Sequence, residues 1–498
     1  MNMSPREWPY VASSLFKQTH IRASPYAGDV DFSVLDTADA AASASIDMVS
    51  LADLLRNSFV YPPHTIYRDV KIMTTGFATQ QDREDELRFH FVYQSVLAAA
   101  RPLSHTVSDE TLLRTYHQLL SQAVQRSTAS LKAPWFLQSG GKDSTSVAIA
   151  VADVRPDTTC LTYLGGREEN EVASARFVAR QLGLRHEALV CDPGRAYDRY
   201  LAMVPRMPLL TADFALLSYA DLATEIGRQQ GDGIIDGMGV DLFFGVPMHL
   251  RDHLIIGLAR QAPIPGAWLT YPFIRQNFKL CFALASLQMN RFERHIPGSR
   301  FSDHEVNGLF GWNASTHSRK RMDVFQDDVR AARSAEGVRR IVLVMLEAGG
   351  FAKSMYSAKA MGLRMAYPYC DKPLCEWIFN EVPDDRLIGP GGLNKVLQRR
   401  YIAQRFQRLP YVQNKGSFRF NVPGLARQRF EQVHAFALQA RAVLPGAATW
   451  LEEHRHCLGN KFFASKFYLL AVTLPWLLSR MRHAVSAGGD DAMSPVIS

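Results

Sequence analysis

A short segment rich in glycine and hydroxyl side chains is the part of this sequence best suited to chemistry. Its residues are Ser139, Gly140, Gly141, Lys142, Asp143 and Ser144. Glycine lets a backbone approach a ligand closely, and the first N–H groups of a helix attract anions. The hydroxyls add donors and Lys142 adds positive charge. The segment therefore predicts a phosphate-binding loop, provided that a strand precedes it and a helix follows.

The elements around this loop alternate in type. Strands are predicted at 135–137, 160–164, 187–190 and 233–235, with helices at 144–154, 171–182 and 214–228 between them. This alternation is typical of βαβ units and a parallel sheet. A helix at 109–131, with Ser108 as its N-cap, leads into the pattern, and beyond Gly245 the sequence is almost entirely helical. We therefore expect an α/β fold with a parallel sheet and a largely helical C-terminal part.

The chain is too long for one ordinary core. At 498 residues, two or three structural units are expected. We predict a small N-terminal α+β unit over 1–105, a main domain over 106–484 and a disordered tail over 485–498.

Composition limits the class of protein and its surroundings. The net charge is +8 but is spread along the chain, so nucleic acid is not an expected partner. Six cysteines have no CxxC spacing and the N-terminus has no signal pattern, which favours a reducing cytoplasmic location. Lys466 and Pro475 interrupt the apolar run at 462–481, so we expect a buried C-terminal helix and no membrane span.

The loop lacks the GxxxxGK spacing of the Walker motif. The string SGGKDS instead resembles the SGGxDS signature of ATP pyrophosphatases, which cleave ATP between the α and β phosphates. Bound phosphates would repel the Asp143 carboxylate unless a divalent cation lay between them. The resemblance therefore implies ATP and Mg²⁺ as cofactors.

Downstream segments resemble one family within this class. Glu171 to His186 follows the DExxxA..VA..LG..H spacing of the asparagine synthetase family, and Asp236 to Gly245 resembles its GxGxDExFGG loop. Residues 362–371 resemble its GLEVRVPFLD string, and residues 415–418 its KxGF turn. Together these segments, within residues 108–478, are similar to the synthetase domain of asparagine and β-lactam synthetases.

The resemblance implies roles for individual residues. Asp143 and Asp241 would hold magnesium on the phosphates, and Lys395 would neutralise charge on the departing pyrophosphate or on the tetrahedral centre. The nucleotide would contact the loop residues named above, Ser139 to Ser144, together with Gly237 and Gly239.

Several departures from the family pattern concern the amine side of the reaction. The chain begins Met1-Asn2, whereas glutamine-using members begin with Met-Cys; residues 51–77 still resemble closing strands of a glutaminase domain. Met238 stands where relatives carry a Glu or Tyr that deprotonates the amine, and Arg364 and Ala366 replace the Glu and Arg of the LEVR string. Met238 cannot accept a proton.

A base must therefore come from elsewhere. Asp236, Tyr367 and Glu168 are candidates on this chain, and the substrate phosphate or a partner protein are alternatives.

These features predict an ATP-dependent, AMP-forming ligase that adenylates a small-molecule or peptide carboxylate and forms an amide. We expect glutamine hydrolysis to be lost, and family members with a damaged glutaminase unit commonly close rings. The resemblance therefore favours intramolecular ring closure, to a β-lactam or a lasso-type macrolactam, in specialised metabolism such as antibiotic biosynthesis. The alternative is a carboxamide-forming enzyme that uses ammonia, for instance on a sugar acid. An RNA-modifying enzyme of the same loop class and a catalytically inactive subunit are further alternatives. Whether a partner protein delivers the substrate stays open.

Overall fold

The structure is a computed structural model. It describes residues 20–22, 46–68, 70–73, 77–81, 89–93, 107–165, 169–248, 250, 253, 271–290, 292–296, 300–332, 335–407 and 420–487.

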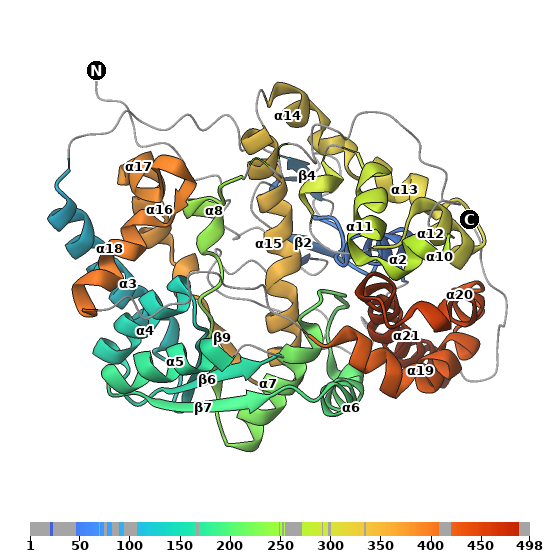
Figure 1. The fold of residues 1–498 in the computed structure, drawn as a ribbon, viewed down its shortest axis with the longest axis horizontal. Coiled ribbons are helices and arrows are strands. Elements are labelled where there is room, and N and C mark those ends of the chain that lie inside the picture. The colour runs from blue at the N-terminus through green and yellow to red at the C-terminus, as the bar shows by residue number, and fades with distance from the viewer. Residues whose placement is uncertain are drawn as a thin grey trace.

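A five-stranded parallel sheet forms one side of the molecule (Figure 1). Its strands are β5 (Pro134–Leu137), β6 (Thr159–Leu164), β7 (Arg185–Val190), β8 (Gly233–Ile235) and β9 (Arg364–Ala366). Their order is β7-β6-β5-β8-β9. After β5 the chain adds β6 and β7 on one side of that strand, and it then adds β8 and β9 on the other side. The topological switch point therefore lies between β5 and β8. Open α/β sheets bind ligands beyond the carboxyl ends of their strands at such a point.

Two groups of helices pack with this sheet. The first includes α3 (Asp109–Thr128), α4 (Lys142–Val154), α5 (Glu169–Gln181) and α18 (Val396–Arg405); the second includes α6 (Pro193–Met203), α7 (Leu216–Arg228) and the long α15 (Ala335–Ala360). The Ser108 side chain accepts a hydrogen bond from the Thr111 N–H and caps α3 as predicted. The predicted strands and helices of this region are confirmed, with boundaries shifted by a few residues.

The other side of the molecule is helical, with α15 running between the two sides (Figure 1). It holds α10 (Pro272–Gln276), α11 (Phe278–Leu287), α12 (Asp303–Phe310), α13 (Ala314–Lys320), α14 (Gln326–Ala331), α19 (Val422–Gln439), α20 (Ala447–His454) and α21 (Lys461–Ala487). Two further helices, α16 (Lys372–Glu381) and α17 (Asp384–Leu387), lie beside α18. The predicted class, a parallel-sheet α/β domain with a largely helical C-terminal part, is confirmed.

The N-terminal region shares the main core. Its elements are β1 (His20–Arg22), α2 (Met48–Asn57), β2 (Lys71–Met73), β3 (Phe77–Gln81) and β4 (Phe89–Tyr93). Leu51, Leu54 and Leu55 of α2 are fully buried in the same cluster as the sheet. Arg56 forms a buried ion pair with Glu293 and a partly exposed one with Asp303, and both tie α2 to the helical side.

One expectation for this region needs correction. Residues 51–77 resemble closing strands of a glutaminase domain, yet their first part, 51–57, belongs to helix α2. Its leucines recur at helical spacing, and Asp47 caps the helix by accepting from the N–H groups of Val49 and Ser50. Much of the predicted unit at 1–105 lies outside the described residues, so its boundary stays a prediction.

Helix α21 contains a segment, Lys461–Met481, long and apolar enough to span a membrane, but 94% of its most apolar window is buried inside the protein. It packs along α19. Its Lys466 ammonium lies 2.7 Å from both carboxylate oxygens of Glu305 on α12. A buried core helix is therefore the better description, as predicted. The predicted tail at 485–498 begins inside α21, and its residues 488–498 lie outside the described part.

This ion pair gives a stability prediction. Lys466→Met should lower the free energy of unfolding by roughly 3 kcal/mol or more, because it leaves the Glu305 charge buried without its partner. Burial alone would raise the pKa of Glu305, but the charge and hydrogen bonds of Lys466, together with hydrogen bonds from Ser302, outweigh burial and lower that pKa. The contribution should therefore be present at neutral pH and be lost as acid protonates Glu305. Urea unfolding at pH 7 would measure it, with exposed Lys461→Met on the same helix as control; equal effects of the two substitutions would contradict the prediction.

Candidate functional site

The predicted phosphate loop connects β5 to α4 at the switch point. Ser144 Oγ lies 2.9 Å from Ser139 Oγ and donates to the Ser139 carbonyl at 2.8 Å, which closes the loop on itself. Thr145 Oγ1 donates to the Gly141 carbonyl at 2.8 Å. Among the described residues, no side chain caps the N-terminus of α4, where Gly141 is the N-cap. The loop is therefore held in shape by its own hydroxyls, with an uncapped helix start facing the ligand side.

Gly140 has a steric reason to be glycine. A Cβ on this residue would lie 2.9 Å from the Cα of Glu171, which belongs to α5. The loop thus packs backbone to backbone against the start of α5, and any side chain would push the two apart.

Gly140→Ala should therefore weaken nucleotide binding by about tenfold or more, because the loop must shift away from α5. Titration with a fluorescent ATP analogue would measure the affinity. Gly308→Ala is the matched control, since a Cβ there meets nothing within 4 Å. Unchanged affinity in Gly140→Ala would show that the loop tolerates the shift.

The second predicted loop follows β8 and lies against the first. A Cβ on Gly237 would come within 3.7 Å of the Ser144 backbone, so the two loops are neighbours. Gly239 has φ +101°, a backbone conformation that residues with a side chain rarely adopt. It is the N-cap of the short helix α8 (Val240–Phe244). Asp241 lies in the first turn of α8, and about half of its side chain is exposed.

Lys395 joins the two loops. Its Nζ lies 2.8 Å from both carboxylate oxygens of Asp143 and 2.7 Å from Oδ1 of Asp241. Burial alone would lower the pKa of Lys395, which is only 5% exposed, but the two carboxylates outweigh burial and raise it above its usual value. The lysine is therefore a cation between two acids from adjacent strand ends.

The backbone aims this lysine inward. Lys395 follows the hairpin of β10 (Ile388–Gly389) and β11 (Leu393–Asn394) and is the N-cap of α18, with φ 58°. A non-glycine residue in this left-handed region costs roughly 1 kcal/mol or more. Its N–H donates to the Leu387 carbonyl at 2.7 Å, and its carbonyl accepts from the Arg399 N–H at 3.0 Å. Strain of this kind is concentrated at functional sites.

The two carboxylates fit a magnesium triphosphate. Both touch the same ammonium group, so they face one cation-sized position beside the phosphate loop. Magnesium is typically held by one or two carboxylates together with substrate phosphates. Among the described residues no group of three or more His, Cys, Asp and Glu side chains is arranged to hold a metal ion.

A buried polar group supports the loop from behind, and sequence reasoning did not predict it. Tyr369 Oη lies 2.9 Å from Tyr116 Oη, accepts from Gln398 Nε2 at 2.8 Å and donates to the Asp143 carbonyl at 3.4 Å. Burial raises the pKa of Tyr369 well above its usual value, so it stays a neutral donor. Tyr369 lies in the segment that resembles GLEVRVPFLD, but no spacing connects it to Tyr116 or Gln398.

Two of the three candidates for a base on the amine side, Asp236 and Tyr367, lie close to each other, and Asp236 contacts Met238. Asp236 is buried; it accepts from Tyr219 Oη at 2.8 Å and from the Met238 N–H at 3.2 Å. The Tyr367 hydroxyl lies 2.7 Å from Ser354 Oγ, and burial raises its pKa well above its usual value. These hydrogen bonds of Asp236 and Tyr367 fix the chain at the ends of β8 and β9. Neither side chain is therefore placed as a general base for the amine. Glu168 and residues 415–418 lie outside the described residues.

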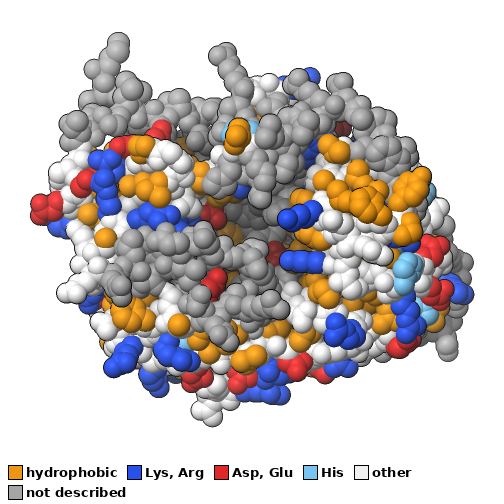
Figure 2. Space-filling model, in the orientation of Figure 1, with side chains coloured by type: hydrophobic (Ala, Val, Ile, Leu, Met, Phe, Trp, Pro, Cys, Tyr) orange, Lys and Arg blue, Asp and Glu red, His pale blue; other side chains and the backbone are white. Residues whose placement is uncertain are grey.

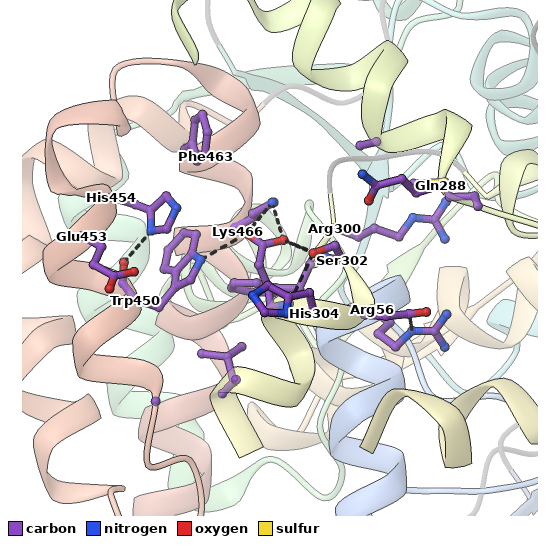
Figure 3. A pocket seen from close by; sticks show the side chains of 18 of the residues that line it. Arg56, Gln288, Arg300, Ser302, His304, Trp450, Glu453, His454, Phe463 and Lys466 are labelled. Atoms are coloured by element: carbon purple, nitrogen blue, oxygen red, sulfur yellow. Dashed lines mark hydrogen bonds and ion pairs between the residues drawn. The ribbon is translucent and has the colours of Figure 1, made fainter. Parts of the chain in front are cut away.

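A sizeable cavity in the described part of the chain lies elsewhere, among α2, α11, α12, α20 and α21 (Figure 3). Its volume is about 980 Å³, and Lys466, Trp450 and His454 point into it. Glu305 in its wall is paired within the protein: it forms an ion pair with Lys466 and accepts from Trp450 Nε1 at 3.1 Å. The described lining residues include none of the predicted site residues. The molecule is also hollowed near its centre, between the α16–α18 side and the α11–α13 side, with acidic and basic side chains around the hollow (Figure 2).

Comparison with known proteins decides the family. The family model for asparagine synthase matches residues 115–439, about two thirds of the chain. This chain belongs to the asparagine synthase family. The match includes the phosphate loop, the Asp241 loop and Lys395, and it supports an ATP-dependent, amide-forming synthetase.

The other two searches add less. Seventy-one chains of solved structures match. One is an NMN synthetase from Francisella tularensis, 14% identical, with a TM-score of 0.23, covering 49% of this chain and 96% of that chain. A search of curated proteins finds no match.

Proposed function

We propose that this protein is an AMP-forming ligase that activates a carboxylate with ATP and joins it to an amine as an amide. The observation that carries the proposal is the triad of Lys395, Asp143 and Asp241 at the switch point of the sheet, beside a self-closed phosphate loop. Two carboxylates suit a magnesium ion on the phosphates, and a buried lysine suits charge that develops during transfer.

The first step forms an acyl-adenylate. A carboxylate oxygen of the substrate attacks the α phosphorus of ATP, and the bond to the pyrophosphate oxygen breaks. Lys395 neutralises charge on the leaving pyrophosphate, while Gly237, Gly239 and the loop from Ser139 to Ser144 orient the phosphates. Asp143 and Asp241 would hold magnesium, which supplies further charge neutralisation on the phosphate oxygens.

The second step forms the amide and does not use a base from the described residues. The amine attacks the acyl carbon, and AMP leaves with its bonding electron pair. Met238 has no basic group, both Asp236 oxygens accept hydrogen bonds and Tyr367 is buried. We therefore assign the proton to the phosphate of the departing AMP.

Ring closure within one substrate molecule is our preferred form of this reaction, with a peptide or small amino acid derivative as substrate and a role in specialised metabolism. A tethered amine gains a high effective molarity, which offsets the lack of a dedicated base at Met238. We further propose that the protein acts in the cytoplasm.

Two measurements test the proposal. The purified protein with Mg²⁺ATP and a panel of carboxylic acids should release AMP and pyrophosphate with at least one acid; release of ADP and phosphate would overturn it. Adding ¹⁵N-ammonium separates ring closure from carboxamide formation. A cyclase should give the same unlabelled product at the same rate, whereas a labelled amide would show that ammonia is the amine.

A further inference from the structure

The ammonium of Lys395 lies where a metal bound by the two aspartates would lie. It touches three carboxylate oxygens from two loops, at 2.7 to 2.8 Å. Without a cation at this position the Asp143 and Asp241 carboxylates would repel each other in a partly dry site. In the protein without ligands, Lys395 therefore offsets the repulsion between the two carboxylates, as a bound magnesium ion would.

Only the side chain of Lys395 is free to change place. Its backbone is fixed on both sides, by the hydrogen bond from its N–H to the Leu387 carbonyl and by the bond from the Arg399 N–H to its own carbonyl. The four rotatable bonds of a lysine side chain allow the ammonium to swing without moving the loop. An alternative anionic partner would be needed nearby, because leaving both carboxylates would otherwise bury an unpaired ammonium.

We infer that Lys395 is an internal substitute for the metal, which keeps divalent cations out of the site until a nucleotide triphosphate arrives. A metal ion without nucleotide would have to displace the lysine from both aspartates. The displaced ammonium would then be left without an anionic partner. A metal bound to ATP brings phosphate oxygens that can receive the ammonium, so lysine and metal exchange partners in one step. The inference rests on the metal role proposed for Asp143 and Asp241, and it makes metal entry depend on the nucleotide.

The test is metal binding without catalysis, with Mn²⁺ as the probe and electron paramagnetic resonance as the readout on the full chain. Wild-type protein should take up no Mn²⁺ until α,β-methylene-ATP is added. Lys395→Met should bind one Mn²⁺ per chain without nucleotide, at least about tenfold more tightly than wild type. Adding Asp241→Asn to that variant should abolish the gain. Lys372→Met is the matched control, because Lys372 pairs with a single exposed acid, Glu376.

Thermal unfolding provides a second readout. Mn²⁺ alone should raise the Tm of Lys395→Met and leave that of the wild type unchanged, because a ligand stabilises only the form that binds it. If Lys395→Met does not fold, the same Mn²⁺ measurements on Lys395→Gln and on the wild type still test the inference. Mn²⁺ binding to wild-type protein without nucleotide, as tight as to the variant, would overturn the inference.

Failure of this inference differs from failure of the proposed function. If a folded Lys395 variant takes up no Mn²⁺ while the wild type still makes AMP, the exchange is wrong and the ligase stands. If the variant gains Mn²⁺ but no acid yields AMP, the exchange stands and the proposed chemistry is wrong.

Discussion

Asp143→Ala and Asp241→Ala are each expected to lower AMP formation by about a thousandfold or more while leaving the fold intact. Each substitution removes one carboxylate of the pair that faces Lys395, and metal stabilisation of transferring phosphates contributes several kcal/mol. Neither side chain is deeply buried, since 30% of Asp143 and 53% of Asp241 are exposed. Stability should therefore change little.

The assay is release of AMP and pyrophosphate at saturating Mg²⁺ATP, with circular dichroism to confirm folding. Asp153→Ala is a matched control, because Asp153 lies on the same helix as Asp143 and nitrogen atoms of His117 and Arg405 are 3.7 and 3.8 Å from its carboxylate. Full activity in either site variant would show that the metal is held elsewhere.

Lys395→Ala should lower kcat by about a hundredfold or more, with at most a few-fold change in the affinity for ATP. The reason is that a positive group which acts on charge developing at the departing pyrophosphate contributes more to the transition state than to the bound nucleotide. Removing the lysine also takes away the cation between Asp143 and Asp241, so the assay needs enough Mg²⁺ to fill the site.

Steady-state kinetics with varied ATP separate the two effects. Lys395→Arg is the informative companion, because it keeps the charge but has a different shape and should recover only part of the rate. A rise in KM for ATP with unchanged kcat would contradict the assigned role and make Lys395 a nucleotide-binding residue only.

Local patterns in the sequence determined the framework of this protein. The glycine pair before a helix, the alternation of short strands and helices from 133 to 235, and the Ser108 cap depend on neighbouring residues, so they could be predicted with boundaries shifted by a few residues. The resemblance in the segments around Asp143, Asp241 and Lys395 also identified the residues that the fold brings together.

Tertiary structure alone decided what surrounds those residues. Tyr116, Tyr369 and Gln398 lie on three separate elements and meet only because α3, α18 and the 3₁₀ turn Pro368–Cys370 pack together. The left-handed backbone of Lys395 depends on the hairpin before it and the helix after it. Likewise, the apolar pattern in 462–481 resembles that of a membrane span, but its burial against α19 and the Lys466–Glu305 pair depend on the assembled core. Contacts between residues hundreds of positions apart leave no periodic signal in a single sequence, because their spacing is set by packing and not by helix or strand geometry.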